Sequence, residues 1–189
     1  LAMTTDGNGR FVYLSPEVGG QIALVEAAAN IIASGAEPLA ITDCLNYGDP
    51  TDPEIFWELH QSVQGMADAC REFNTPVISG NVSLYNENNG QAIHPTPMVG
   101  MVGLIKNIDR VIPSFVQYPG DKVYLVGQTR DDYAGSELQK MMTGDISGMV
   151  KSFDLHHVHQ YMQRLLTTME NGLVSSAHDL SEGGLGVAL

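Results

Sequence analysis

Several short stretches of the chain have the apolar pattern of β-strands. Residues 10–15 alternate aromatic and aliphatic side chains after the turn signal Asp-Gly-Asn-Gly at positions 6–9. Residues 38–42, 77–82 and 98–105 are apolar runs that follow a proline or end in polar residues. Runs of this length with turn residues at their ends predict strands, and the later ones are apolar enough to be buried in a sheet.

Two longer segments between these strands have helical spacing of their apolar residues. Residues 21–34 are rich in alanine, and Gly35 is suited to end this helix because glycine readily adopts positive φ. Asp52 before Pro53 is an N-cap signature, and apolar residues then recur every three or four positions as far as residue 74. The alternation of strands with long helices predicts an α/β or α+β fold in which helices cover a sheet.

The pattern changes after residue 106. Prolines and glycines interrupt residues 111–120, which we interpret as a linker between a domain of residues 1–110 and a second one of residues 121–189. In the second domain we expect a strand at 122–127 and helices at 136–140 and 155–170, the last capped by Asp154. The chain starts without Met and ends on apolar residues, so we expect both domains to be incomplete.

Composition narrows the possible partners. The net charge is −13, from 22 acidic and 9 basic residues, and no Lys/Arg cluster offsets it, so nucleic acid is not an expected partner. ATP remains compatible because Mg²⁺ neutralises its phosphates. Cys44 and Cys70 lack metal-site spacing and are interpreted as free thiols of a cytoplasmic protein, and no apolar run is long enough to predict a membrane span.

Polar side chains gather where two predicted strands end. Asp43 follows the strand at 38–42, and Gly80, Asn81 and Ser83 follow the apolar start of the strand at 77–82. Carboxylate and amide oxygens suit Mg²⁺, and ligands of open sheets collect at the carboxyl ends of strands, so neighbouring strands would form one pocket here. A second interpretation also fits the pattern: Asp43 caps a turn and Asn81 adopts a left-handed backbone conformation.

Histidines offer weaker candidates. His178 lies beside Asp179 near Ser181 and two glycines, which we interpret as a helix start capped by Asp179 or Ser181. The histidines at 156, 157 and 159 lack a companion carboxylate in the sequence and are expected to lie on a solvated helix face. Common nucleotide-loop and nucleophile-elbow motifs are absent from the sequence.

A set of motifs in fixed order resembles one enzyme family closely. They lie at residues 42–50 (Thr-Asp-Cys-Leu-Asn-Tyr-Gly-Asp-Pro), 53–57 (Pro-Glu-Ile-Phe-Trp), 80–87 (Gly-Asn-Val-Ser-Leu-Tyr-Asn-Glu), 95–97 (Pro-Thr-Pro) and 178–185 (His-Asp-Leu-Ser-Glu-Gly-Gly-Leu). Together they resemble the synthetase subunit of phosphoribosylformylglycinamidine synthases, in the superfamily of aminoimidazole ribonucleotide synthetase. Cys44 and Tyr47 stand where many relatives have Asn and Phe.

The resemblance implies a fold, an activity and a site. It implies an N-terminal domain with a mixed sheet covered by helices, from the second half of a synthetase, followed by the start of a C-terminal α/β domain. The implied reaction converts formylglycinamide ribonucleotide to its amidine with ATP, Mg²⁺ and ammonia from a glutaminase. Asp43 and Gly80 would contact ATP, Asn81 would bind Mg²⁺, and Ser83 would contact the substrate.

The same resemblance places the catalytic histidine and several phosphate contacts in the first half of the synthetase, outside this chain. We therefore expect the fragment to be inactive by itself and to associate with further copies. Two alternatives stay open: another enzyme of the superfamily, such as a selenophosphate synthetase, and a structural module that holds a nucleotide.

Overall fold

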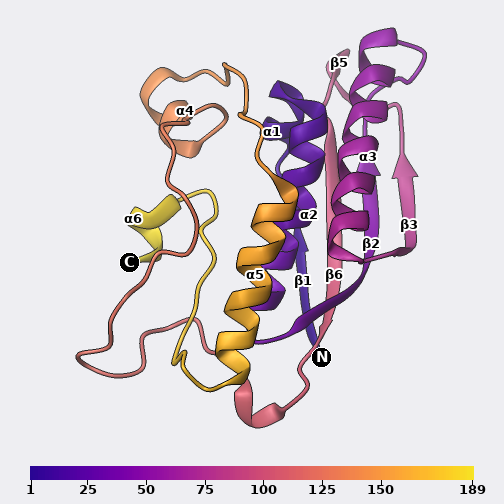
Figure 1. Cartoon of the computed structure of the whole chain (residues 1–189). Coiled ribbons are helices and arrows are strands. Elements are labelled where there is room, and N and C mark those ends of the chain that lie inside the picture. Colours follow the sequence, from indigo (N-terminus) through magenta and orange to yellow (C-terminus); the bar gives the residue numbers. More distant parts are fainter.

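A four-stranded mixed sheet forms the centre of the first hundred residues. The computed structural model describes residues 1–189. The strands are β1 (Ala2–Asp6), β2 (Glu37–Asn46), β3 (Val77–Ser83) and β6 (Thr96–Leu104), in the order β1-β6-β2-β3. β6 runs antiparallel to β1 and β2, whereas β2 and β3 are parallel. The mixed sheet covered by helices is thus confirmed, and β3 is an edge strand (Figure 1).

Helices α1 (Gly9–Leu14), α2 (Pro16–Ala33) and α3 (Pro53–Phe73) lie on one face of this sheet (Figure 1). α2 and α3 pack closely because glycines stand at their crossing. A Cβ on Gly65 would lie 1.9 Å from the Glu17 carbonyl oxygen, and one on Gly20 would lie 2.1 Å from that of Ser62. The core between helices and sheet is made of small and aliphatic side chains, chiefly Leu24, Ala27, Ala28, Ile31, Ile41, Met66, Val99 and Met101.

A further helix covers α2 and α3 from outside. α5 (Leu155–Glu170) contacts both helices and forms the outermost layer (Figure 1). Its side chains Leu155, Val158 and Met162 pack against the core cluster. The remaining elements are short: β4 (Glu87–Asn88), β5 (Gln91–Ala92), the 3-10 helix η1 (Ile108–Arg110), α4 (Glu137–Thr143) and α6 (Gly184–Ala188).

The start of the chain differs from the sequence prediction. The first strand is β1, before the Gly-containing turn, and the predicted strand at 10–15 is largely the helix α1. The physical reason is the cap: the Asn8 side chain accepts a hydrogen bond from Arg10 N, which starts a helix, and Val12 is the buried residue of that helix. Alternation over so few residues did not distinguish the two structures.

Other predicted elements of the first hundred residues are present. α3 begins after the Asp52 cap, which accepts from Glu54 N, and Gly35 follows α2 with φ +83°. α2 starts earlier than predicted, at Pro16, and β2 continues through Asn46. The loop predicted from residue 43 therefore begins only after residue 46, so Asp43 lies within a strand.

The second part of the chain contains the predicted helices but lacks the predicted strand. α4 and α5 are confirmed, and the Asp154 side chain caps α5 by accepting from His157 N. Residues 122–127 form no strand, because a strand requires a hydrogen-bonded neighbour and this segment has none. α6 starts at Gly184 without a side-chain cap, so the predicted cap by Asp179 or Ser181 is wrong. The domain boundary at 111–120 stays a prediction.

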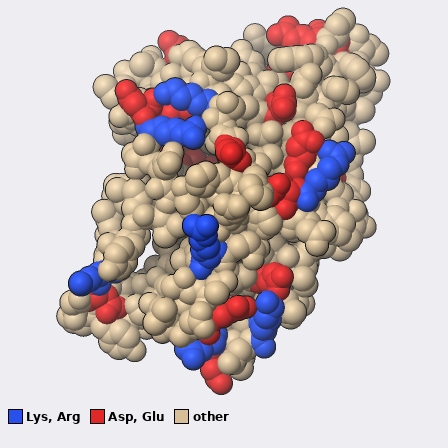
Figure 2. Space-filling view, viewed as in Figure 1, with Lys and Arg blue, Asp and Glu red and all other residues tan.

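The charged side chains are spread over the surface. On the face in Figure 2, Lys and Arg are few and form no continuous patch. Before Lys106, Arg10 and Arg71 are the only Lys or Arg residues.

No helix is both long and apolar enough to cross a membrane. Cys44 and Cys70 are free, as predicted.

Candidate functional site

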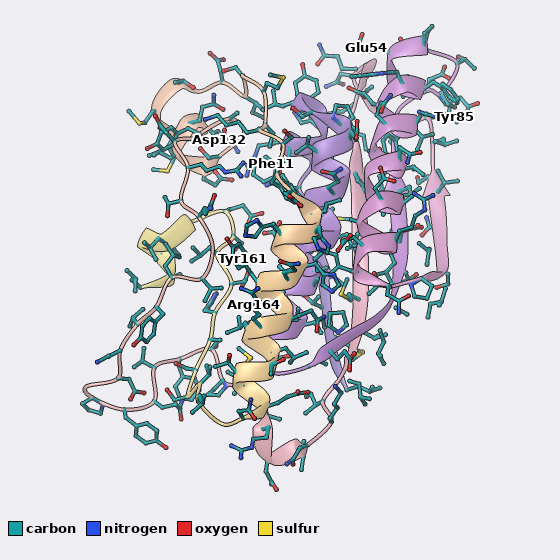
Figure 3. All side chains as sticks on the ribbon, in the orientation of Figure 1. Phe11, Glu54, Tyr85, Asp132, Tyr161 and Arg164 are labelled. Carbon is teal, nitrogen blue, oxygen red and sulfur yellow. The ribbon has the colours of Figure 1, made fainter.

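Three strands bring their carboxyl ends to one edge of the sheet. β1 and β2 both run antiparallel to β6, and β3 runs parallel to β2, so all three point the same way. Segments with polar residues follow them, at residues 7–10, 47–50 and 84–87, and the first two also contain glycine. Figure 3 shows Tyr85 beyond the tip of β3, at the end of the molecule where Glu54 starts α3. Such an edge is where open α/β sheets collect ligands.

Asp43 and Gly80 are direct neighbours across β2 and β3. A Cβ on Gly80 would lie 1.9 Å from Asp43 Oδ1 and 2.9 Å from the Asp43 carbonyl oxygen, so the carboxylate lies over the glycine backbone and would have to move to admit a side chain there. Burial raises the pKa of the Asp43 carboxyl. Asp43 is on the helix-covered face, opposite Val99 of the core, while Gly80 is exposed at the edge strand. The two strands are neighbours, which is the condition for the predicted pocket, and the ATP contacts of Asp43 and Gly80 stay predictions.

Asn81 and Ser83 lie on the other face of the same strand. Side chains alternate along β3, and the pair Thr42 and Ser79, whose Oγ atoms are 2.8 Å apart, marks this second face. The expected single pocket is therefore divided by β3, with Asp43 and Gly80 on one side and Asn81 and Ser83 on the other. Because β3 is an edge strand, a ligand at its free edge can reach both faces.

The residues around Asn81 fit only one kind of magnesium site. Its neighbours on that face, Thr42, Cys44 and Ser79, include no carboxylate. No group of three or more His, Cys, Asp or Glu residues is arranged to hold a metal ion. Mg²⁺ commonly keeps several waters and takes few protein ligands when phosphates supply the others. The exposed amide of Asn81 therefore suits an ion held mainly by nucleotide phosphates.

Ser83 ends β3 in a network of hydrogen bonds. The Asn86 side-chain amide lies 3.1 Å from Ser83 Oγ and donates to the carbonyl oxygen of Tyr47, 3.0 Å away. Tyr47 is fully buried, and its hydroxyl lies 2.6 Å from Ser62 Oγ of α3. Burial raises the pKa of Tyr47 to about 12. The end of β3 is thus tied to β2 and, through Tyr47, to α3.

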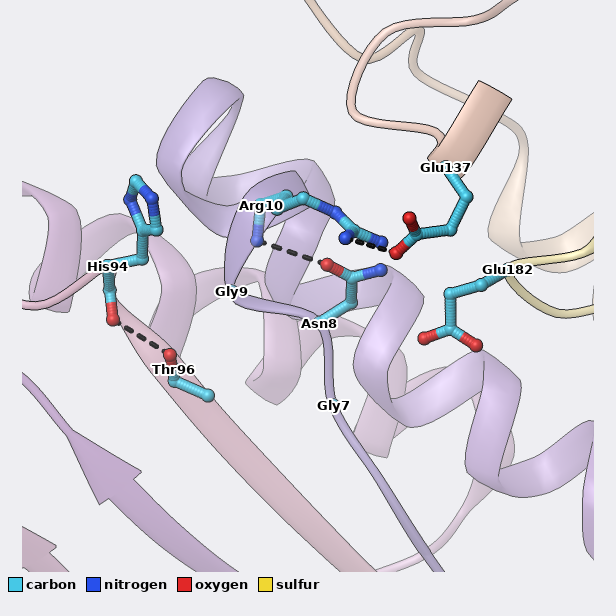
Figure 4. Close-up of a pocket in the computed structure, with 8 residues that line it drawn as sticks. All are labelled: Gly7, Asn8, Gly9, Arg10, His94, Thr96, Glu137 and Glu182. Carbon is cyan, nitrogen blue, oxygen red and sulfur yellow. Dashed lines mark hydrogen bonds and ion pairs between the residues drawn. The ribbon is translucent and has the colours of Figure 1, made fainter. Parts of the chain in front are cut away.

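A polar cavity of about 500 Å³ lies after β1 (Figure 4). It is lined by Gly7, Asn8, Gly9, Arg10, His94, Thr96, Glu137 and Glu182. Asn8 is 9% exposed, and its Nδ2 is buried without a hydrogen-bond partner; in Figure 4 it points toward the cavity. Arg10 donates from Nε to the Gly135 carbonyl oxygen at 3.0 Å and forms an ion pair with Glu137.

Sequence reasoning missed this cavity, because it treated residues 6–9 only as a turn. An available signal was Arg10 itself, which follows the Gly-Asn-Gly turn at residues 7–9 in a part of the chain nearly without Lys or Arg.

The histidine predictions need a correction. His156 Nδ1 and His159 Nδ1 lie 2.9 Å and 3.1 Å from Glu72 Oε1, so α3 supplies the carboxylate that the local sequence lacks. Hydrogen bonds from His156 and then His159 lower the pKa of Glu72. His159 also stacks on Phe73. His156 and His157 are exposed, as predicted for a solvated face, whereas His159 is only 22% exposed and helps to attach α5 to α3. His178 contacts Asp179.

The fold and the strand-end site define an α/β domain of the aminoimidazole-ribonucleotide-synthetase type. The chain belongs to the family "AIR synthase related protein, N-terminal domain", whose model matches residues 1–105. It is 98% identical over 189 residues to the phosphoribosylformylglycinamidine synthase subunit PurL of Limosilactobacillus reuteri, and 77% identical to that of Limosilactobacillus fermentum. In both cases the chain spans 26% of the relative's length. The resemblance seen in the motifs is confirmed.

Solved structures agree with this assignment. The chain is similar to Thermotoga maritima phosphoribosylformylglycinamidine synthase II, with a TM-score of 0.54 and 39% identity over 58% of this chain and 18% of that chain. It is also similar to T. maritima PurL complexed with FGAR, with a TM-score of 0.63 and 26% identity over 90% of this chain and 23% of that chain. Hydrogenase maturation protein HypE in complex with ATP, 19% identical, has a TM-score of 0.51 over 63% of this chain and 34% of that chain and shares the fold alone.

Proposed function

We propose that this chain is part of the synthetase that converts formylglycinamide ribonucleotide to its amidine, with ATP and glutamine-derived ammonia, in purine biosynthesis. The chain supplies one wall of the ATP, Mg²⁺ and substrate site. The other wall, with the catalytic histidine, belongs to another half of the synthetase, and a glutaminase supplies the ammonia. As an enzyme of purine biosynthesis it would act in the cytoplasm.

The close contact of Asp43 with the Gly80 backbone is the observation that carries this proposal. It leaves the half-buried carboxylate of Asp43 on β2 beside the bare backbone of the exposed edge strand β3, where ATP can approach both. Asp43 accepts hydrogen bonds from the nucleotide, and the Gly80 backbone lies against it. Asn81, on the other face of β3, binds the Mg²⁺ that accompanies the phosphates.

The substrate would extend along the sheet edge from the cavity to Ser83. Ser83 pairs with Asn46 on β2, and Asn46 pairs with Thr96, which lines the cavity. Two strand spacings separate Ser83 from the cavity, roughly 10 Å. This is the length scale of a ribonucleotide. The buried Asn8 amide and Arg10 are donors for its phosphate, which would displace Glu137 from Arg10.

The reaction that fits these contacts transfers the γ-phosphoryl group of ATP to the amide oxygen of the substrate, after which ammonia displaces phosphate. Mg²⁺ supplies charge stabilisation for the transferring phosphoryl group when it is bound. Asp43 and Gly80 hold the nucleotide, Ser83 orients the substrate, and the edge of β3 brings the two together. No residue of this chain is assigned as the catalytic acid or base.

Substitution of Asp43→Ala and of Asn81→Ala in the full-length enzyme tests this proposal, with Asn88→Ala as a control on the exposed hairpin. We expect turnover to fall by about two orders of magnitude or more while the melting temperature is kept, because these side chains act on ligands. A site that only holds a structural nucleotide would give the reverse result, with lower stability and nearly normal turnover. Activity on selenide or on another substrate of the superfamily would favour the alternative that the chain belongs to another enzyme of the superfamily, such as a selenophosphate synthetase.

The isolated chain should bind Mg-ATP only weakly, because it offers one wall of the pocket. Titration calorimetry that finds micromolar or tighter affinity would contradict this. The chain should also self-associate through the sheet face that carries no helix, where Met3 is 78% exposed. Analytical ultracentrifugation measures this directly, and a strictly monomeric species would count against it.

A further inference from the structure

The side chain of Asn86 makes more hydrogen bonds at the sheet edge than its turn requires. Its Nδ2 lies 3.0 Å from the Tyr47 carbonyl oxygen, 2.9 Å from the Ser83 carbonyl oxygen and 3.1 Å from Ser83 Oγ. Its Oδ1 lies 3.3 Å from Ser83 Oγ. The amide thus holds both the backbone and the hydroxyl of Ser83, and it connects them to the end of β2.

The backbone of the turn has its own supports. Tyr85 N donates to the Gly48 carbonyl oxygen at 2.9 Å, and Asn86 N donates to that of Tyr47 at 3.1 Å. Ile93 N donates to the Asn86 carbonyl oxygen at 3.1 Å. Tyr85 has φ +60°, a left-handed conformation that these bonds maintain. The turn therefore does not depend on the Asn86 side chain alone, and the extra bonds of that side chain act chiefly on Ser83.

We propose that Asn86 is a positioning residue that aims the Ser83 hydroxyl at the ribonucleotide substrate. This inference rests on the proposed contact between Ser83 and the substrate. The amide Nδ2 shares its two protons among the carbonyl oxygens of Tyr47 and Ser83 and Ser83 Oγ, and its bond to Ser83 Oγ occupies an acceptor site of that oxygen. The Ser83 O–H then has only the longer contact to Asn86 Oδ1, so it can turn to donate to a substrate oxygen.

Substitution of Asn86→Asp tests the direction of these hydrogen bonds. A carboxylate cannot donate, and it accepts the Ser83 O–H strongly, so the hydroxyl proton would no longer be free for the substrate. Asn86→Ala removes both partners and leaves the hydroxyl free to rotate. Both variants should weaken substrate binding, with Asn86→Asp at least as damaging as Asn86→Ala.

The experiment is a double-mutant cycle in the full-length enzyme, with Ser83→Ala, Asn86→Ala and the pair, and Asn88→Ala as the matched control. We expect each single variant to raise the KM for formylglycinamide ribonucleotide by about tenfold, the loss of one hydrogen bond. The KM for ATP should stay unchanged. The double variant should be no worse than Ser83→Ala, because Asn86 has no other partner in substrate binding.

The experiment distinguishes a wrong role for Ser83 from a wrong role for Asn86. If Ser83→Ala leaves the substrate KM unchanged, the proposed role of Ser83 is wrong, and this inference falls with it. If Ser83→Ala is impaired but Asn86→Ala is normal, adds fully to it, or raises the KM for ATP equally, only the positioning role is wrong. Failure of both Asn86 variants to fold would mean that the side chain supports the fold instead, which also overturns the inference.

Discussion

Residues 1–105 and residues 106–189 differ in how their apolar side chains are covered. In the first part, side chains of the sheet and of α2 and α3 are buried in one cluster. In the second part, Val123, Tyr124 and Leu125 are exposed. The apolar side of α5 is buried because this helix packs on α2 and α3 of the first part. An apolar pattern becomes a stable element only where a partner is present to bury it.

The strongest test of this contrast compares two glycines. Gly65→Ala would bring a Cβ to 1.9 Å from the Glu17 carbonyl oxygen at the crossing of α2 and α3. Overpacking of this kind costs about 3 kcal/mol, so the urea midpoint of the chain should drop clearly. Gly186→Ala in α6 meets no atom within 4 Å and should leave the midpoint in place. Equal shifts of the urea midpoint in the two variants would contradict the difference in burial between residues 1–105 and residues 106–189.

A second test asks whether residues 122–127 fail to form a strand only because this chain offers them no neighbouring strand. Leu125 is 48% exposed here, so Leu125→Asp should leave the stability of this chain unchanged. In full-length PurL, where we expect these residues to form a buried strand, the matching substitution should lower the melting temperature by several degrees, as for a charge placed in a core. Thr129→Asp is the control. A full-length protein indifferent to Leu125→Asp would refute the predicted strand.

The contrast also explains which predictions succeeded. The caps Asp52 and Asp154 and the glycine after α2 are local signals, and each was readable from neighbouring residues. The opposite faces of Asp43 and Asn81 depend on strand register, and the Glu72 contact of α5 depends on residues about eighty positions apart. The cavity combines Arg10 with Glu137 and Glu182, which no local pattern connects. Local chemistry was predictable, whereas contacts between distant segments were not.

The acidic residues where the two parts meet give a pH-dependent test. Burial raises the pKa of Glu26 to about 8, with further contributions from Asp6, Glu182 and Asp179. The folded chain therefore binds more protons than the unfolded chain between pH 4.5 and about 8, and stability falls as pH rises through this window. Glu26→Gln should raise the melting temperature at pH 8.5 and change it little near pH 4.5. An unchanged melting temperature at pH 8.5 would show that Glu26 is well solvated in the fold, which would contradict the raised pKa.

The smallest expected effect concerns the attachment of α5 through Glu72. The Glu72 side chain is 27% exposed, and His156 and His159 lower its pKa, so its contribution is present above pH 4.5 and is lost as pH falls through the lowered value. α5 also packs through apolar side chains, with Leu166 and Met169 buried and Leu155, Val158 and Met162 against the core cluster, so Glu72→Gln should reduce the melting temperature only slightly near pH 6. Hydrogen exchange in residues 155–163 should rise more visibly than the melting temperature falls, since the contact acts locally. Glu87→Gln on the exposed hairpin is the matched control. Unchanged exchange in α5 would mean that apolar packing alone joins the two parts of the chain.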